Sequence, residues 1–124
     1  MGDGDRPAVV GPYTPARRAG DWVVCSGQLG LQDGAPAGTL EDEVRLAVAS
    51  IARLLAEHGA GLGDVAKTTV FLADIADFAA MNEAYVAAFG EHRPARSAFA
   101  VGALPLGARV EIEAWAYAPG GATG

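Results

Sequence analysis

The segment VAKTTVFLADIADFAAMNEAYVAAFG, residues 65–90, joins a β-rich run directly to a helical pattern, and this junction decides the fold class. The β-branched and aromatic residues of 65–73 predict a strand. Asp74 then supplies a helix cap, and a helix is predicted over 75–90. Its apolar stripe at helical spacing is Phe78, Met81, Tyr85, Ala88 and Phe89. A strand followed at once by such a helix predicts an α/β (α+β) protein.

The same two patterns precede this segment in the chain. A turn at Ala19-Gly20-Asp21 leads into a predicted strand at Trp22–Ser26. A helix is predicted over residues 40–58, where Thr39 can cap it and acidic residues occupy the first turn. Its apolar stripe is Val44, Ala47, Ile51, Leu54 and Leu55.

Two more strands are predicted after the segment, near residues 97–101 and 108–118. The expected order is therefore β-β-α-β-α-β-β, with two helices packed on one face of a mostly antiparallel or mixed sheet. A chain of 124 residues suits a single domain over residues 1–124. Its ordered core is expected at about 11–118.

Two of the predicted strands carry apolar side chains that favour burial of both faces. The runs 22–25 and 70–73 are apolar at consecutive positions, so both sides of each strand carry apolar side chains. Two helices cover one face of a sheet and leave the other uncovered. A second copy of the chain is the simplest cover for that face, so the pattern predicts an oligomer.

Composition disfavours binding to nucleic acid or an anionic membrane, without forbidding a local basic cleft, and it limits the role of cysteine. The formal net charge is −6 and Lys67 is the sole lysine, so no basic cluster for nucleic acid or anionic membrane is present in the sequence. Cys25 is the sole cysteine, which excludes an intrachain disulfide and a cysteine-based metal site; a buried, inert thiol is expected. No apolar run approaches the roughly 20 residues that span a bilayer. The expected location is the cytoplasm.

Few residues suggest chemistry by themselves. The sequence contains neither a phosphate-binding loop nor a dinucleotide motif. His58 and His92 fall at predicted helix ends, where capping of carbonyls or exposure is expected rather than metal binding. Pro94 stiffens the approach to Arg96, whose guanidinium suits two-point capture of a carboxylate. The alternative for Arg96 is an ordinary surface arginine.

A carboxylate candidate lies in the alternating stretch 109–115. Val110, Ile112 and Ala114 should face one way, and Glu111 with its alternating neighbours the other. Glu111 could orient or deprotonate water in a cleft between subunits. The alternative is a solvated strand face that carries an Arg–Glu pair.

The ordered set of these residues resembles the RidA/YjgF family over about residues 11–118. The stretches that carry the resemblance are GPYTPA at 11–16, CSGQ at 25–28, KTTVFL at 67–72, MNEAY at 81–85, PARS at 94–97, LP at 104–105 and VEIEA at 110–114. The resemblance implies a chorismate-mutase-like fold and a homotrimer with clefts between subunits. It also implies hydrolysis of reactive enamines and imines of the 2-aminoacrylate type to 2-oxo acids and ammonia, as in 2-iminobutanoate/2-iminopropanoate deaminases.

The resemblance also implies roles for particular residues. Arg96 would pair with the substrate carboxylate and Glu111 would position water, without a metal or an organic cofactor. The implied substrate-binding residues are Tyr13, Ser26, Gly27, Asn82 and Ala98. Asn82 lies on the flank of the helical stripe, where a structural role is the alternative. Ala98 stands where the best-known members have a cysteine, so thiol-dependent regulation at that position is excluded.

Other functions remain open at the level of sequence. The same cleft could serve a non-catalytic, small-carboxylate-binding regulatory trimer, which needs Arg96 but not the chemistry of Glu111. Ribonuclease activity, reported for some relatives, is disfavoured by the acidic charge. A chorismate-mutase-like reaction would need several cationic groups for a dicarboxylate, and only Arg96 is well placed in the sequence.

Overall fold

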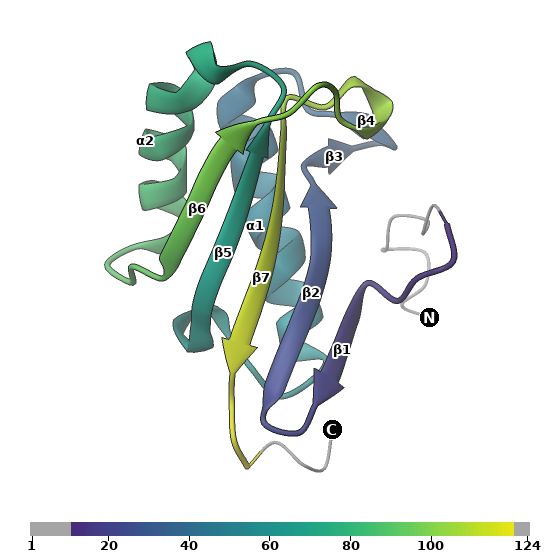
Figure 1. The fold of residues 1–124 in the computed structure, drawn as a ribbon, viewed down its shortest axis with the longest axis vertical. Helices are drawn as coiled ribbons and strands as arrows, with labels where there is room; N and C mark the ends of the chain where they lie inside the picture. Colours follow the sequence, from purple (N-terminus) through teal and green to yellow (C-terminus); the bar gives the residue numbers. More distant parts are fainter. Residues whose placement is uncertain (1–10, 121–124) are drawn as a thin grey trace.

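The structure is a computed structural model that describes residues 11–120. The predicted ordered core of 11–118 falls inside this range, whereas residues 1–10 and 121–124 lie outside it. Figure 1 shows a sheet backed by two helices. The two helices and the main strands follow one another along the chain in the predicted order.

The main sheet has five strands and is mixed, as predicted. In spatial order they are β1 (Ala16–Ala19), β2 (Trp22–Leu29), β7 (Val110–Tyr117), β5 (Val65–Leu72) and β6 (Ala95–Ala100). β5 and β6 are parallel, and the other neighbours are antiparallel. A short hairpin of β3 (Leu31–Gln32) and β4 (Ala35–Pro36) was not predicted from the sequence.

Helix α1 (Leu40–Ala56) confirms the sequence prediction closely. The hydroxyl of Thr39 accepts a hydrogen bond of 3.1 Å from the amide of Asp42, which is the expected cap. All five residues of the predicted apolar stripe are buried in the core. Burial of this stripe against β2 and β7 fixes the helix on the sheet.

Helix α2 (Phe78–Phe89) begins three residues later than the sequence predicted. Residues Ile75–Asp77 form a 3₁₀ turn, and Asp74 caps this turn by accepting a 2.9 Å hydrogen bond from the amide of Ala76. A short 3₁₀ turn is a tight way to redirect the chain from a strand into a helix. Local sequence marks the cap but not the hydrogen-bond pattern that follows it.

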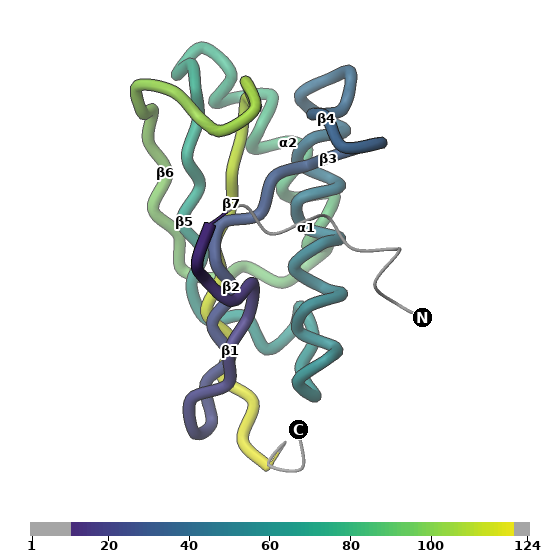
Figure 2. The backbone as a smooth tube through the Cα atoms, turned by 90° about the vertical axis from the view of Figure 1, so that its right-hand side faces the viewer, coloured from purple at the N-terminus to yellow at the C-terminus, as the bar shows by residue number. Residues whose placement is uncertain are grey.

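Both helices lie on one side of the sheet, as Figure 2 shows from the edge. The core between the helices and the sheet contains the inward side chains of β7, which are all fully buried: Val110, Ile112, Ala114 and Ala116. The other face of the sheet (the open face) has no helix over it. None of the described helices is long and apolar enough to cross a membrane.

Large aromatic side chains are exposed on the open face, which agrees with the predicted covering problem. Trp22, Trp115 and Tyr117 form a cluster of edge-to-face rings at one end of this face, and Trp115 is 45% exposed. Phe99 is also 45% exposed and packs edge-to-face on Phe71. Apolar surface of this kind is typical of contact with another protein surface.

Candidate active site

Arg96 lies in the edge strand β6 and points toward helix α2. Its register partner in β5 is Thr68, which is fully buried on the helix-covered face. The guanidinium carbon lies 4.9 Å from the ring centre of Tyr85 and 5.7 Å from that of Phe78. Its Nη1 lies 3.8 Å from the sulfur of Met81. Two aromatic faces thus hold the cation at the sheet edge.

The ring below Arg96 is itself fixed. The Tyr85 hydroxyl lies 2.6 Å from the hydroxyl of Thr68, and its ring stacks at 4.7 Å on Phe89. Burial raises the pKa of Tyr85, although the Thr68 contact and Arg96 oppose the effect. The phenol therefore stays neutral near physiological pH. Arg96 rests on a rigid, uncharged support.

Two other predicted residues accompany Arg96. Ala98 follows it by two positions in β6 and pairs with Val70, so its side chain shares the helix-covered face. Asn82 lies in α2 beside Met81, and its Oδ1 atom is buried without a hydrogen-bond partner in the described part of the chain. An unsatisfied buried acceptor is uncommon in a folded protein. It could accept a hydrogen bond from a ligand or another chain.

Glu111 lies on the open face of the sheet. Its neighbours Val110 and Ile112 are buried under the helices, so the alternation of β7 turns Glu111 the other way, as predicted. It pairs with Phe71 of β5 and with Leu29 of β2. Its carboxylate is half-buried at this position.

Gly27 makes room for that carboxylate. The predicted strand ended at Ser26, but Gly27 lies within β2, at an irregularity between Cys25 and Gln28. A Cβ atom on Gly27 would lie 1.9 Å from Oε2 of Glu111. Only glycine therefore lets the carboxylate rest against the strand in this position, which is the structural reason for a glycine within β2.

Ser26 fastens the preceding segment beside this carboxylate. Its amide and its hydroxyl both donate to the carbonyl of Pro15, at 2.8 and 3.0 Å. Tyr13 lies two residues before Pro15, and its ring is 50% exposed. The segment that carries Tyr13 is thus tied to β2 next to Gly27.

The environment of Glu111 raises its pKa. Burial is the main cause, and the neighbouring Glu113 carboxylate adds to it. Both effects disfavour the charged form. The carboxyl group therefore holds its proton to a higher pH than an ordinary glutamate, which suits a group that accepts a proton and later returns it.

The structure separates the two principal residues rather than bringing them together within one chain. Arg96 faces α2, whereas Glu111 faces away from both helices, so the sheet lies between them. Neither forms an ion pair with any residue of the described range 11–120. We call the group of Arg96, Ala98 and Asn82 the arginine half-site. The group of Ser26, Gly27 and Glu111 is the glutamate half-site. One protomer cannot bring its own Arg96 and Glu111 into a common pocket.

The cysteine and the two histidines lie in different local environments. Cys25 is buried, and burial raises its pKa to about 11, so the thiol is not ionised at neutral pH. His92 contacts the carbonyl of Val65 through Nε2 at 2.7 Å. The carbonyl of His58 accepts a hydrogen bond from Arg18. Across residues 11–120, no three His, Cys, Asp or Glu side chains group as a metal site would require.

Sequence analysis missed one buried ion pair that positions β7. Glu43 is fully buried and accepts hydrogen bonds from the backbone amide of Arg109, at 2.9 Å, and from its guanidinium. Its place in the first turn of a helix suggested only a favourable interaction with the helix dipole. The pair fixes the start of β7, two residues before Glu111.

A five-stranded mixed sheet backed by two helices defines the chorismate-mutase-like class of α+β proteins, and solved structures of this fold match the chain over about nine-tenths of its length. The family model described as Endoribonuclease L-PSP matches residues 3–118. The chain therefore belongs to this family, which is the RidA/YjgF family that the sequence resembles.

Named relatives support this membership. The 2-iminobutanoate/2-iminopropanoate deaminase of Mus musculus is 42% identical over 112 residues, which cover 87% of this chain and 82% of that protein. The structure of RidA from a Psychrobacter species is 39% identical with a TM-score of 0.85, covering 90% and 92% of the two chains. That of E. coli TdcF with bound serine is 36% identical with a TM-score of 0.84, covering 90% and 91%.

Proposed function

We propose that this protein is a cytoplasmic deaminase that hydrolyses reactive enamines and imines of the 2-aminoacrylate type to 2-oxo acids and ammonia. It acts as a homotrimer in which Arg96 of one copy meets Glu111 of the next across a cleft. One observation carries the proposal: the two charges lie on opposite faces of the sheet, and each lacks a counter-charge among residues 11–120. The deaminase name of the mouse relative supports the same reaction.

The reaction follows from the chemistry of the two half-sites. The enamine tautomerises to an imine, and Arg96 holds the substrate carboxylate by two hydrogen bonds. Glu111 accepts a proton from water as the oxygen bonds to the imine carbon, and it returns this proton to the nitrogen, which gives a carbinolamine. Glu111 then moves the hydroxyl proton of this intermediate to the nitrogen, the carbon–nitrogen bond breaks, ammonia leaves, and the oxygen becomes the carbonyl of the 2-oxo acid. The raised pKa of Glu111 makes its carboxylate a stronger base toward water. These steps need no metal or organic cofactor.

The remaining predicted residues shape the cleft in this proposal. Gly27 leaves room for the Glu111 carboxylate, and Ser26 holds the adjacent segment from which Tyr13 closes over the substrate. Ala98 leaves space beside Arg96. The unsatisfied oxygen of Asn82 accepts a hydrogen bond from the substrate or from the neighbouring copy.

A subunit-mixing experiment tests the shared site directly. Arg96→Ala and Glu111→Gln are each expected to be inactive in an ammonia-release assay on imines generated in situ from a panel of amino acids. When equal amounts of the two variants are refolded together, roughly a quarter of the wild-type rate should return. Random pairing places an intact Arg96 from one copy opposite an intact Glu111 from the next in about one cleft in four. No recovery in verified mixed oligomers would contradict a site shared between chains.

Ligand binding without turnover is the second candidate, and the serine bound to TdcF favours it. A regulatory trimer would hold small carboxylates in the same cleft through Arg96. It would bind them with equal affinity in wild type and Glu111→Gln, and it would not accelerate ammonia release. The assay above separates the two functions.

A further inference from the structure

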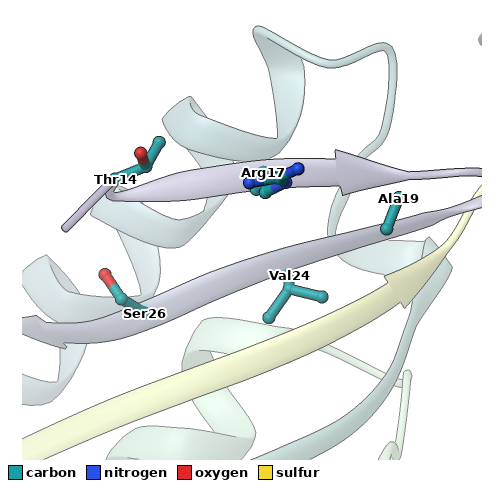
Figure 3. Close-up of a pocket in the computed structure, with 5 residues that line it drawn as sticks. All are labelled: Thr14, Arg17, Ala19, Val24 and Ser26. Atoms are coloured by element: carbon teal, nitrogen blue, oxygen red, sulfur yellow. The ribbon is translucent and has the colours of Figure 1, made fainter.

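A pocket of about 390 Å³ opens on the open face of the sheet, at the edge strand β1. Figure 3 shows its lining, which is formed by Thr14, Arg17, Ala19, Val24 and Ser26. Ser26 precedes Gly27 directly, so the pocket adjoins the glutamate half-site.

Arg17 is the charged group of the pocket, and it is not engaged in the fold. It is exposed and forms no hydrogen bond or ion pair with the described residues. Its neighbour Arg18 behaves differently, because it faces the other side of β1 and donates to three backbone carbonyls. Those carbonyls belong to Gly20, His58 and Ala118. Arg18 has a structural task, whereas the guanidinium of Arg17 lines the pocket and has no partner among residues 11–120.

The other lining groups define what such a ligand looks like. The hydroxyl of Thr14 has no partner within residues 11–120, so it can donate to an anion. The hydroxyl proton of Ser26 is already directed to the carbonyl of Pro15. Ala19 and Val24 supply apolar walls. A carboxylate on a short aliphatic stem matches one guanidinium, one hydroxyl and two apolar walls.

We propose that Arg17 and Thr14 form a second anion subsite, which takes the side-chain carboxylate of an imine derived from an acidic amino acid. The inference rests on the proposed function. With the α-carboxylate on Arg96 of one copy and the reacting carbon at Glu111 of the next, the substrate side chain extends past Ser26 toward Arg17. A cleft closed by a second copy also desolvates Arg17, and a desolvated guanidinium requires a counter-charge.

The test compares substrates within one assay. Imines are generated in situ from glutamate and aspartate, and from alanine and leucine, by oxidases that accept each class. The wild type should act on the acidic imines, and Arg17→Met should lower kcat/KM for these roughly tenfold to a hundredfold, the effect of losing a charge-assisted hydrogen bond. Rates on the neutral imines should stay unchanged.

Arg45→Met is the matched control, since Arg45 loses the same charge from the exposed surface of α1, where it pairs with Asp42. It should change neither class of substrate. An equal loss on both classes in Arg17→Met, or dissociation of its oligomer in size-exclusion chromatography, would make Arg17 an interface residue and overturn the subsite. Unchanged selectivity, or a wild type that ignores acidic imines, overturns it as well.

A wild type inactive on every imine would defeat the proposed function, and the subsite is then judged by binding. Calorimetric titration with glutarate and with butyrate compares a dicarboxylate with a monocarboxylate of similar stem. Tighter binding of glutarate that is lost in Arg17→Met supports the subsite. Equal affinities for the two acids reject it.

Discussion

The two half-sites are built in opposite ways. Arg96 is supported from below by the rings of Tyr85 and Phe78, and Tyr85 is in turn fixed by Thr68. The carboxylate of Glu111 instead occupies room that exists because Gly27 has no side chain. Large aromatic residues are exposed on the same open face of the sheet. The cation is held by packing that one chain completes by itself. The carboxylate occupies the room that Gly27 leaves on the open face.

This difference shows how one sheet can divide a reaction between its faces. In the proposed reaction the arginine half-site would serve as a rigid anchor, and the glutamate half-site, where the pKa of Glu111 is raised, would serve as a partly solvated acid–base group. Covering the open face would remove water from Glu111 and strengthen each electrostatic interaction there. Variants that damage one half-site and spare the other therefore test the comparison.

The largest effect is expected from Glu111→Gln. The amide keeps the shape of the side chain but cannot accept the proton of water, so turnover should fall roughly 10²- to 10⁴-fold. Ammonia release at saturating substrate measures the change. Circular dichroism should show an intact fold. An unchanged rate would assign Glu111 a purely structural role.

The next effect is expected at the anchor. Arg96→Lys should fail nearly as badly as Arg96→Ala, because an ammonium cannot reproduce the two-point grip, and such contacts contribute on the order of 2–5 kcal/mol. The loss is measured in kcat/KM. Arg93→Lys is the matched control, since the hydrogen bonds of Arg93 within residues 11–120 go to the backbone carbonyls of Gly90 and His92. Near-normal activity of Arg96→Lys would remove the anchoring role.

Gly27→Ala tests the space beside the carboxylate. The added methyl group should displace the flexible end of Glu111 while β2 stays in place, and turnover should fall about tenfold to a hundredfold. Gly63→Ala serves as the control, because a Cβ there meets nothing within 4 Å. Equal rates in both variants would show that the position of the carboxylate does not limit the reaction.

A smaller effect is expected from the support of Arg96. Tyr85→Leu should raise KM about tenfold with little change in kcat, since a ring that holds the cation is lost. Tyr85→Phe keeps the ring and should restore KM, although it gives up the contact with Thr68. Equal KM values for Tyr85→Leu and Tyr85→Phe would show that the aromatic ring does not contribute to substrate binding.

The smallest effect concerns stability. The pKa of Glu111 is raised in the folded chain, so its contribution to stability is present at acidic pH and is lost as the pH rises through the folded pKa. Glu111→Gln should therefore raise Tm slightly at neutral pH and leave it unchanged at a pH well below the usual range for glutamate. Thermal unfolding at the two pH values measures this. A gain at acidic pH alone contradicts the raised pKa.

Much of the fold was predictable because local patterns carried it. The cap at Thr39 and the stripe of α1 agree with the sequence prediction, and so does the alternation that separates Glu111 from Val110 and Ile112. The start of α2 was wrong by three residues, since a 3₁₀ turn and a helix share the same capping residue types. The place of Gly27 inside β2 was missed because glycine is otherwise a turn signal.

The buried partners were less predictable. Glu43 has the sequence signature of an exposed first-turn acid, yet it pairs with Arg109 from the far end of the chain. Arg17 and Arg18 are identical side chains in adjacent positions, and strand alternation says that they face apart. It does not say which of them finds three carbonyl partners and which lines a pocket.

The sequence by itself determined the two helices and the main strands, their order, the uncovered face and the two residues that define the proposed chemistry. Tertiary structure alone decided that these residues lie on opposite sides of one sheet. The physical reason lies in the two-residue period of a strand. This period tells which side chains of one strand share a face, but it does not tell whether that face is on the same side of the sheet as a given face of another strand. That relation depends on the register of β6 on β5, where Arg96 meets Thr68, and of β5 on β7, where Phe71 meets Glu111.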